Sequence, residues 1–227
     1  MKKTLILLFV AALGAGTMSS CSKSNKGKLS GEWTISSWTS TETDTYGNPS
    51  VTDTDVTTVD ASSITMVSSS TDGSATSTIN GTVAAATWTI EKDGTWTRTS
   101  DMSYTITEPT YSYTAQMINT ESGTWSFIGK NKTAELGKNE RVAMSVLSSS
   151  TTTTATYSAG GISTSDTSTS ADTYAEGENV ETFLIVESKS KELSLSQVGA
   201  SSYTSTDSNG TTTSSSTSNT ALVLIQE

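Results

Sequence analysis

The sequence predicts an all-β protein, organised as an antiparallel up-and-down meander with long Ser/Thr-rich hairpins. The chain of 227 residues contains 45 Thr, 42 Ser, 7 Tyr and 5 Trp, and Thr, Tyr and Trp favour strands. From Leu29 onward its apolar residues alternate with polar ones and show no helical periodicity, as a sheet with one buried face requires. Asn-Gly and Asp-Gly pairs recur, and such pairs supply the positive φ angles of tight hairpin turns.

The first 20 residues have the features of a lipoprotein signal peptide. Lys2 and Lys3 form a basic start, and residues 5–16 are an apolar run of signal-peptide length, too short to span a bilayer. Met18-Ser19-Ser20-Cys21 then resembles a lipobox, with Met in place of the usual Leu and Ser in place of Gly or Ala. We expect cleavage before Cys21 and acylation of this residue. The alternative is an ordinary secretory signal, cut near residues 14–16, that leaves the cysteine free.

Acylated Cys21 would anchor the chain to a membrane, because two or more acyl chains hold a protein stably at a bilayer. It is the only cysteine, so the fold contains no disulfide. We expect a signal peptide over residues 1–20, a flexible tether over 21–28 and one β domain over 29–227. The expected location is the cell envelope, lipid-anchored at the outer membrane.

Residues 86–100 predict one hairpin in detail. Trp88 and Ile90 share a strand face because they are two residues apart. A three-residue loop over 92–94, with its glycine in the left-handed conformation, pairs Ile90 with Trp96. This register keeps all three apolar side chains on the buried face, whereas a two-residue turn would not.

A second set of turns predicts a row of leucines near the C-terminus. A two-residue turn at Asn209-Gly210 places Leu195 opposite Leu224, and a four-residue loop over 188–191 places Leu184 opposite Leu195. We therefore expect Leu184, Leu195 and Leu224 to be buried together on three adjacent strands. By the same reasoning, a turn at Asp72-Gly73 places Met66 opposite Ile79, and Asn80-Gly81 begins the next reversal.

Two stretches, residues 148–174 and 201–220, consist almost entirely of Ser, Thr, Gly and Ala on both faces. They predict either polar loops or long ribbons that stand off the core. We favour ribbons, because Thr keeps an extended backbone without being buried.

The tryptophans are expected to form the centre of a thin core, because each buries a large apolar area. Trp33, Trp88 and Trp96 are assigned to this core. Trp38 lies at an odd separation from Trp33, so on a regular strand it would face the other way. Either a bulge at Ser36-Ser37 turns Trp38 inward, or it is exposed and available for contact, which makes it the candidate ligand-binding residue.

Several short motifs together resemble a known family. They are Leu29-Ser30-Gly31-Glu32-Trp33, Asp93-Gly94-Thr95-Trp96, Gly123-Thr124-Trp125-Ser126-Phe127 and the closing alternation over 192–198 and 221–226. In this order they resemble the lipocalin-like lipoproteins of bacteria, in which Gly-x-Trp opens the first strand and a Gly-Thr-Trp hairpin follows. The resemblance implies a lipocalin-like up-and-down barrel, partly apolar inside, without enzymatic activity. Barrels of about eight strands are filled by side chains or hold one small ligand.

The composition excludes several chemistries. The chain has no histidine, which removes Ser-His-Asp and Cys-His catalysis and His-based metal sites. Residues 188–191 match Ser-x-x-Lys, but in an expected hairpin loop rather than on a helix. Asp53, Asp55 and Asp60 could offer oxygen ligands to calcium, yet a solvated sheet edge explains them better. The net charge of -10 disfavours nucleic acid as a partner.

The sequence thus leads to two functional hypotheses, neither of them enzymatic and neither with a cofactor or metal. The first is a lipid-anchored binding module of the cell envelope, whose lipocalin-like barrel takes a small or glycan-like ligand. The second is a structural or adhesive surface lipoprotein with a filled barrel. A large apolar cavity would favour the first hypothesis, and a packed interior with flat ribbons would favour the second.

Overall fold

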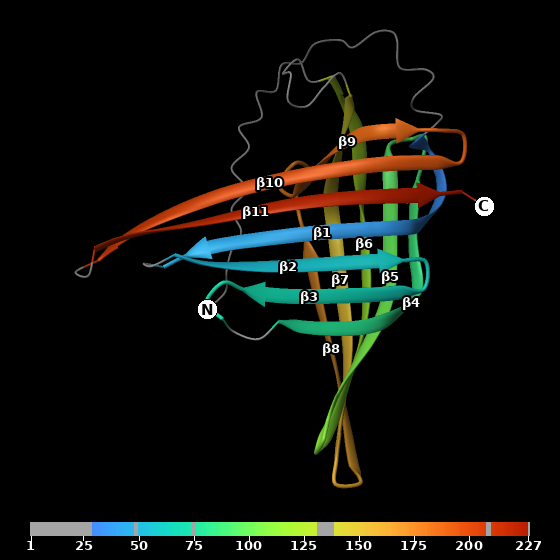
Figure 1. Ribbon diagram of the computed structural model, residues 1–227. Helices are drawn as coiled ribbons and strands as arrows, with labels where there is room; N and C mark the ends of the chain where they lie inside the picture. The colour runs from blue at the N-terminus through green and yellow to red at the C-terminus, as the bar shows by residue number, and fades with distance from the viewer. Residues whose placement is uncertain (1–28, 48–49, 74–75, 131–138, 208–209, 227) are drawn as a thin grey trace.

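The computed structural model describes residues 29–47, 50–73, 76–130, 139–207 and 210–226, which form a single antiparallel sheet of eleven strands (Figure 1). The predicted all-β class is confirmed. The expected signal peptide, the tether and Cys21 lie outside the described residues. The strands are β1 (Gly31–Tyr46), β2 (Val51–Asp60), β3 (Ser63–Ser70), β4 (Ser77–Ile90), β5 (Thr95–Glu108), β6 (Tyr111–Lys130), β7 (Glu140–Ala159), β8 (Ile162–Thr173), β9 (Val180–Ser188), β10 (Glu192–Asp207) and β11 (Gly210–Ile225).

The sheet closes into a barrel. The strand order is β6-β5-β4-β3-β2-β1-β11-β10-β9-β7-β8, and β6 also pairs with β7, so ten strands form a ring and β8 extends from β7. Where Gly31 to Thr34 of β1 pair with Ile90 to Thr87 of β4, the β2–β3 hairpin is left out and eight strands close the ring. We call this the closed end.

Beyond the closed end the strands separate into two arms. In Figure 1, β1, β2, β3, β10 and β11 run toward the left, whereas β5, β6, β7 and β8 run toward the bottom; we call these the first and second arms. Single extra residues at Ser36 in β1, Ala84 in β4 and Leu147 in β7 interrupt the registers of these strands. Such bulges bend a strand and increase its local twist, and they accompany the divergence of the arms.

The core fills the closed end. Trp33 and Trp88 pair directly across β1 and β4, and Trp88 makes edge-to-face contacts with Trp96 and Phe183. Six residues expected in the core are at most 2% exposed: Trp33, Trp88, Ile90, Trp96, Leu195 and Leu224. The cluster also contains Leu29, Trp125, Val142, Met144, Val146, Phe183, Leu193 and Leu222.

Two predicted hairpin registers are confirmed. Ile90 pairs with Trp96, Gly94 has a φ of 99°, and the Glu91 N–H donates to the Thr95 carbonyl at 2.8 Å. Met66 pairs with Ile79. However, the expected reversal at Asn80-Gly81 was wrong, because β4 continues through it. A side chain at residue 81 would come 2.2 Å from the Ser103 carbonyl oxygen, so this glycine permits close strand packing.

The predicted leucine row was wrong in register. Gly210 pairs with Asp207, so β11 begins one residue earlier than expected, and Leu195 lies opposite Leu222 rather than Leu224. This shift of two residues preserves the face, so both leucines remain buried. At β9 the difference is one residue: Leu184 pairs with Ser196, is only half-buried, and leaves the core position to Phe183. A one-residue slip exchanges the two faces of a strand.

The polar stretch over 148–174 forms strand rather than loop, as predicted. Its hairpin turns at Gly160 and Gly161, whose φ values are 57° and 82°, as a two-residue type I′ turn requires. It is not an isolated ribbon, because β7 pairs along its other edge with β6. In the stretch over 201–220, the described residues 201–207 and 210–220 also form strand, within β10 and β11.

Candidate functional site

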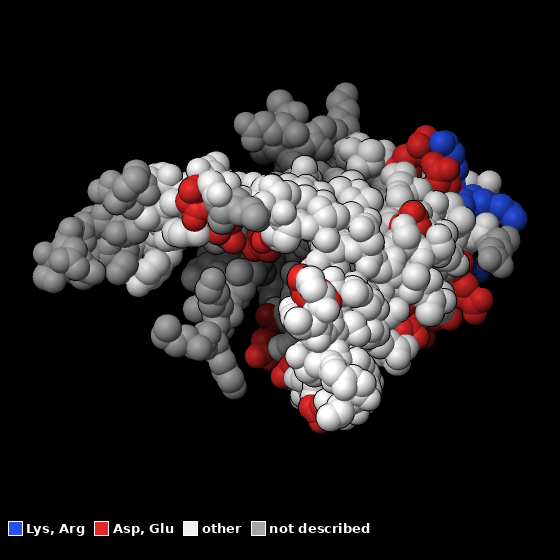
Figure 2. Space-filling model, turned by 60° about the horizontal axis from the view of Figure 1, so that its bottom comes forward, with Lys and Arg blue, Asp and Glu red and all other residues white. Residues whose placement is uncertain are grey.

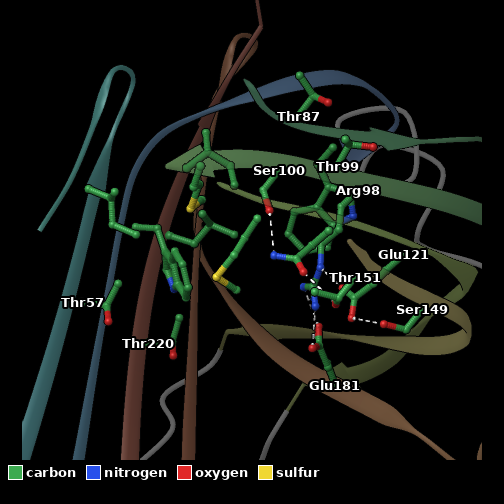
Figure 3. A pocket seen from close by; sticks show the side chains of 18 of the residues that line it. Thr57, Thr87, Arg98, Thr99, Ser100, Glu121, Ser149, Thr151, Glu181 and Thr220 are labelled. Carbon is green, nitrogen blue, oxygen red and sulfur yellow. Dashed lines mark hydrogen bonds and ion pairs between the residues drawn. The ribbon is translucent and has the colours of Figure 1, made fainter. Parts of the chain in front are cut away.

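A cavity of about 470 Å³ lies between the two arms, directly above the core of the closed end. Both arms contribute to it: Figure 3 shows Thr57 and Thr220 on one side and Glu121, Ser149 and Thr151 on the other. Its size is within the range of small-molecule sites in proteins, roughly 300 to 1,000 Å³. Aliphatic, sulfur-containing and aromatic side chains line much of it: Ile35, Trp38, Ile64, Met66, Met102, Tyr104, Met117, Phe183 and Leu222.

Trp38 reaches the cavity because of a bulge in β1. The register between β1 and β11 shifts between Ile35 and Ser37, so the extra residue Ser36 turns Trp38 to the same side as Trp33. Trp38 packs against the core cluster and lines the cavity. Of the two predicted alternatives for Trp38, the inward one is confirmed.

The floor of the cavity contains a charged triad of Arg98, Glu121 and Glu181. Arg98 on β5 donates from both terminal nitrogens to the two carboxylate oxygens of Glu181 on β9, each at 2.8 Å, and from Nε to Glu121 on β6. The three side chains are 29%, 21% and 25% exposed, respectively. The triad therefore joins two strands that are not neighbours, across the interior of the barrel.

Arg98 is held by aromatic rings as well as by carboxylates. Its guanidinium carbon lies 5.6 Å from the ring centre of Trp88 and 5.7 Å from that of Trp96, within the range of cation–π attraction. Burial alone would lower the pKa of Arg98, but the charges and hydrogen bonds of Glu181 and Glu121 outweigh it, so this pKa is raised. Arg98 stays charged, and the triad carries a formal net charge of -1.

A second set of polar side chains lies along the second arm, farther from the closed end than the triad. Thr151 Oγ1 donates to Asn119 Oδ1 at 2.8 Å, and Asn119 Nδ2 donates to Ser100 Oγ at 3.4 Å. On the opposite wall, the hydroxyls of Ser40 and Thr220 lie 3.2 Å apart. The cavity thus combines an apolar lining with a few placed hydroxyl and amide groups, the usual character of a ligand-binding pocket.

The indole nitrogens of the core differ in their partners. Trp33, Trp96 and Trp125 donate to the carbonyls of Leu29, Thr124 and Glu91 at 2.8 to 3.0 Å. The Nε1 of Trp88 is buried without an acceptor among the described residues. Trp88 lies on the boundary between core and cavity, so an unsatisfied donor is buried at the base of the site.

The other sequence motifs do not assemble into sites. Lys189, at a variable position of the Ser-x-x-Lys match over residues 188–191, forms ion pairs with Glu187 and Glu192 at 3.1 and 3.3 Å. Asp60 binds the N–H groups of the β2–β3 turn, away from Asp53 and Asp55. Within the described part of the chain, no group of three or more acidic or cysteine side chains is suited to a metal ion.

The triad was not predicted from the sequence, because only apolar residues were expected at inward positions. Arg98 follows Trp96 by two residues, so alternation along β5 already places both on one face. Glu121 stands two residues before Gly123, which packs opposite Trp96. The two-residue alternation of the strands therefore indicates that Arg98 and Glu121 point inward. The pairing of Arg98 with Glu181, however, depends on the curvature of the whole ring and has no local sequence signal.

In comparisons with known proteins, no protein family, curated protein or solved structure matches this chain. Over the residues that the structure describes, no helix has the length and apolarity to cross a membrane.

Proposed function

We propose that this protein is a lipid-anchored, non-enzymatic component of the cell envelope that binds a small or glycan-like ligand in its β-barrel. The single observation that carries the proposal is the cavity between the arms. It is concave, largely apolar and bordered by a few hydrogen-bonding groups, which together favour a small organic molecule.

The arrangement of core and cavity supports this proposal. Tryptophans fill the closed end, so the barrel has a rigid base, and the cavity begins where that packing stops, at Trp88 and Phe183. Rigid elements hold binding side chains in place more accurately than loops do. Trp38, the residue that the β1 bulge turns inward, offers a large flat contact surface for a ligand.

A structural or adhesive role is the second candidate, and one observation favours it. Hydroxyl pairs join β7 to β8 in a regular row, from Thr152–Thr169 and Thr154–Thr167 to Ser158–Ser163. This row gives the second arm a regular polar surface for contact with another surface. The cavity has no role in that function, so ligand binding separates the two candidates.

Native mass spectrometry of the protein purified from its own host tests the binding role. We expect a retained small molecule, which Trp38→Ala releases and the matched surface change Thr39→Ala does not. Thr39 neighbours Trp38 but is exposed on the other face of β1. If neither the wild type nor Thr39→Ala retains a ligand, and none in a metabolite extract binds, the proposed function is wrong.

The anchoring part of the proposal has a separate test. Cys21→Ala should move the protein from the membrane fraction to the soluble fraction, because the variant has no cysteine in the lipobox-like motif to carry the acyl chains. Metabolic labelling with a palmitate analogue should mark the wild type and leave the variant unlabelled. A variant that stays with the membrane after a high-salt wash would show that another element attaches it.

A further inference from the structure

We infer that the ligand of this cavity is a cationic amphiphile, with an apolar body against Trp38 and an amine directed along the concave face of the first arm. This inference rests on the proposed binding function and names the class of ligand. It is drawn from the distribution of charge around the cavity.

Four carboxylates continue the cavity wall outward from Trp38. Along β1, Glu42 and Asp44 follow Trp38 at even spacing, so they share its face. On β2, Asp55 pairs with Glu42 and Asp53 pairs with Asp44, and Thr57 of the same strand face lines the cavity. We call Glu42, Asp44, Asp53 and Asp55 the acidic quartet.

The acidic quartet has neutral hydrogen-bond partners but no basic one among the described residues. Tyr46 donates to Asp53 at 2.7 Å, and Ser216 donates to Glu42 at 3.5 Å. None of the described ion pairs includes a member of the quartet. Like charges placed directly opposite on two strands destabilise a sheet, and a bound cation would remove that cost.

The strands of the first arm contain no basic residue, and those of the second arm contain only Arg98, Lys130 and Arg141. No Lys or Arg occurs in residues 31–91, 99–129, 142–188 or 192–227. On the face that Figure 2 shows, the visible Lys and Arg atoms gather at one end, whereas Asp and Glu atoms also appear elsewhere. The one guanidinium at the cavity, Arg98, is already bound to two carboxylates. The carboxylates of the first arm would therefore repel an anion and attract a cation.

The apolar lining of the cavity indicates that the ligand also has an apolar part, because a small hydrophilic cation would leave this lining without a contact. Met66, Met102 and Met117 face the cavity from both arms, and methionine adapts to apolar bodies of varied shape. From Trp38 to Glu42 the strand advances four residues, roughly 13 Å, which is about the length of an extended ten-carbon chain. A chain of this length that lies against Trp38 can therefore place its amine beside Glu42 and Asp55.

The test compares three probes that differ only in the head group: decylammonium, decanol and decanoate, each below its critical micelle concentration. Binding to the full chain is measured by titration calorimetry. We expect decylammonium to bind at least about tenfold more tightly than decanoate, with decanol in between. Added salt should weaken decylammonium binding selectively, because exposed charges are screened.

Charge variants give the matched control. The double variant Glu42→Gln/Asp55→Asn should weaken decylammonium binding several-fold and leave decanol unchanged. The variant Glu32→Gln/Glu91→Gln removes the same charge from exposed positions near the closed end and should change neither. If decanoate binds as tightly as decylammonium, the charge inference is wrong while the binding function stands. If none of the three probes binds, both are wrong.

Discussion

Arg98 and Glu181 face each other across the interior of the barrel and form two parallel hydrogen bonds of 2.8 Å. This pair links β5 to β9, which are separated in the ring by β6 and β7. Arg98→Met should destabilise the protein by about 2 kcal/mol, because it leaves two partly buried carboxylates without their partner. Urea unfolding measures this change.

The double variant Arg98→Met/Glu181→Gln serves as the control for that prediction. It should be more stable than Arg98→Met alone, since one of the unpaired charges is gone. Equal stability of the single and double variants would show that the unpaired Glu181 carboxylate carries no cost, which would contradict the reason given for the loss in Arg98→Met.

The indole nitrogens of Trp88 and Trp96 predict a difference between two otherwise similar substitutions. Both side chains are 1% exposed, but Trp96 donates a hydrogen bond to Thr124 and Trp88 has no acceptor among the described residues. Trp96→Phe should therefore cost about 1 kcal/mol more than Trp88→Phe, the net value of one hydrogen bond. A larger loss in Trp88→Phe would indicate that its N–H has a partner in solution.

Leu195 gives a test of the core at the β10–β11 pair. It is 1% exposed and lies opposite Leu222, so Leu195→Ala should cost about 2 to 5 kcal/mol. Thr213→Ala, at an exposed position of the same hairpin, should stay within about 0.5 kcal/mol. Equal urea midpoints for the two variants would contradict the inward face assigned to β10.

Asp60 predicts a specific response to acid. Hydrogen bonds from the Ser62 N–H and from the hydroxyl and N–H of Ser63 lower the pKa of Asp60 to about 2. Because this pKa is depressed on folding from an ordinary value of 3.8, the stabilisation is complete above about pH 4 and is lost as the pH falls through 2. Carboxyl NMR titration should give a midpoint near 2, and a midpoint near 4 would contradict the turn geometry.

The acidic quartet predicts a gain in stability when one charge is removed. Glu42→Gln should stabilise the ligand-free protein by roughly 0.2 to 1 kcal/mol, because Glu42 lies directly opposite Asp55. Glu32→Gln, at an exposed position near the closed end, should have little effect on the thermal midpoint. A loss of stability in Glu42→Gln would show that the quartet is stabilised by contacts of its own.

The parts of the fold that could be predicted are those where apolar residues mark the register. Trp88, Ile90 and Trp96 fixed the β4–β5 hairpin, because only one loop length buries all three. Between Ser201 and Thr220 every candidate turn is flanked by Ser and Thr, so no apolar residue distinguishes a register from one shifted by two. Leu184 was misplaced because a bulge in β9 moved the pairing by one residue.

The candidate site could be predicted only in part. Trp38 was found because its odd spacing from Trp33 raised the question of a bulge. The cavity itself depends on how far the arms diverge, and this follows from bulges in several strands at once rather than from any local pattern. The acidic quartet lies on that same cavity-facing side, and its significance appears only when β1 and β2 are paired.

The eight-stranded closed end and the arms differ in how deeply their backbone amides are covered. The backbone amides at the β1–β4 pairing of Trp33 with Trp88 are covered by a dense aromatic core, whereas all twelve residues of β8 are exposed. Hydrogen exchange should consequently be slowest at Trp33 and Trp88 and become faster along each arm toward its tip. The cavity lies between the slowly exchanging closed end and the rapidly exchanging tips of the arms. A bound molecule would therefore slow hydrogen exchange mainly in the inner half of each arm.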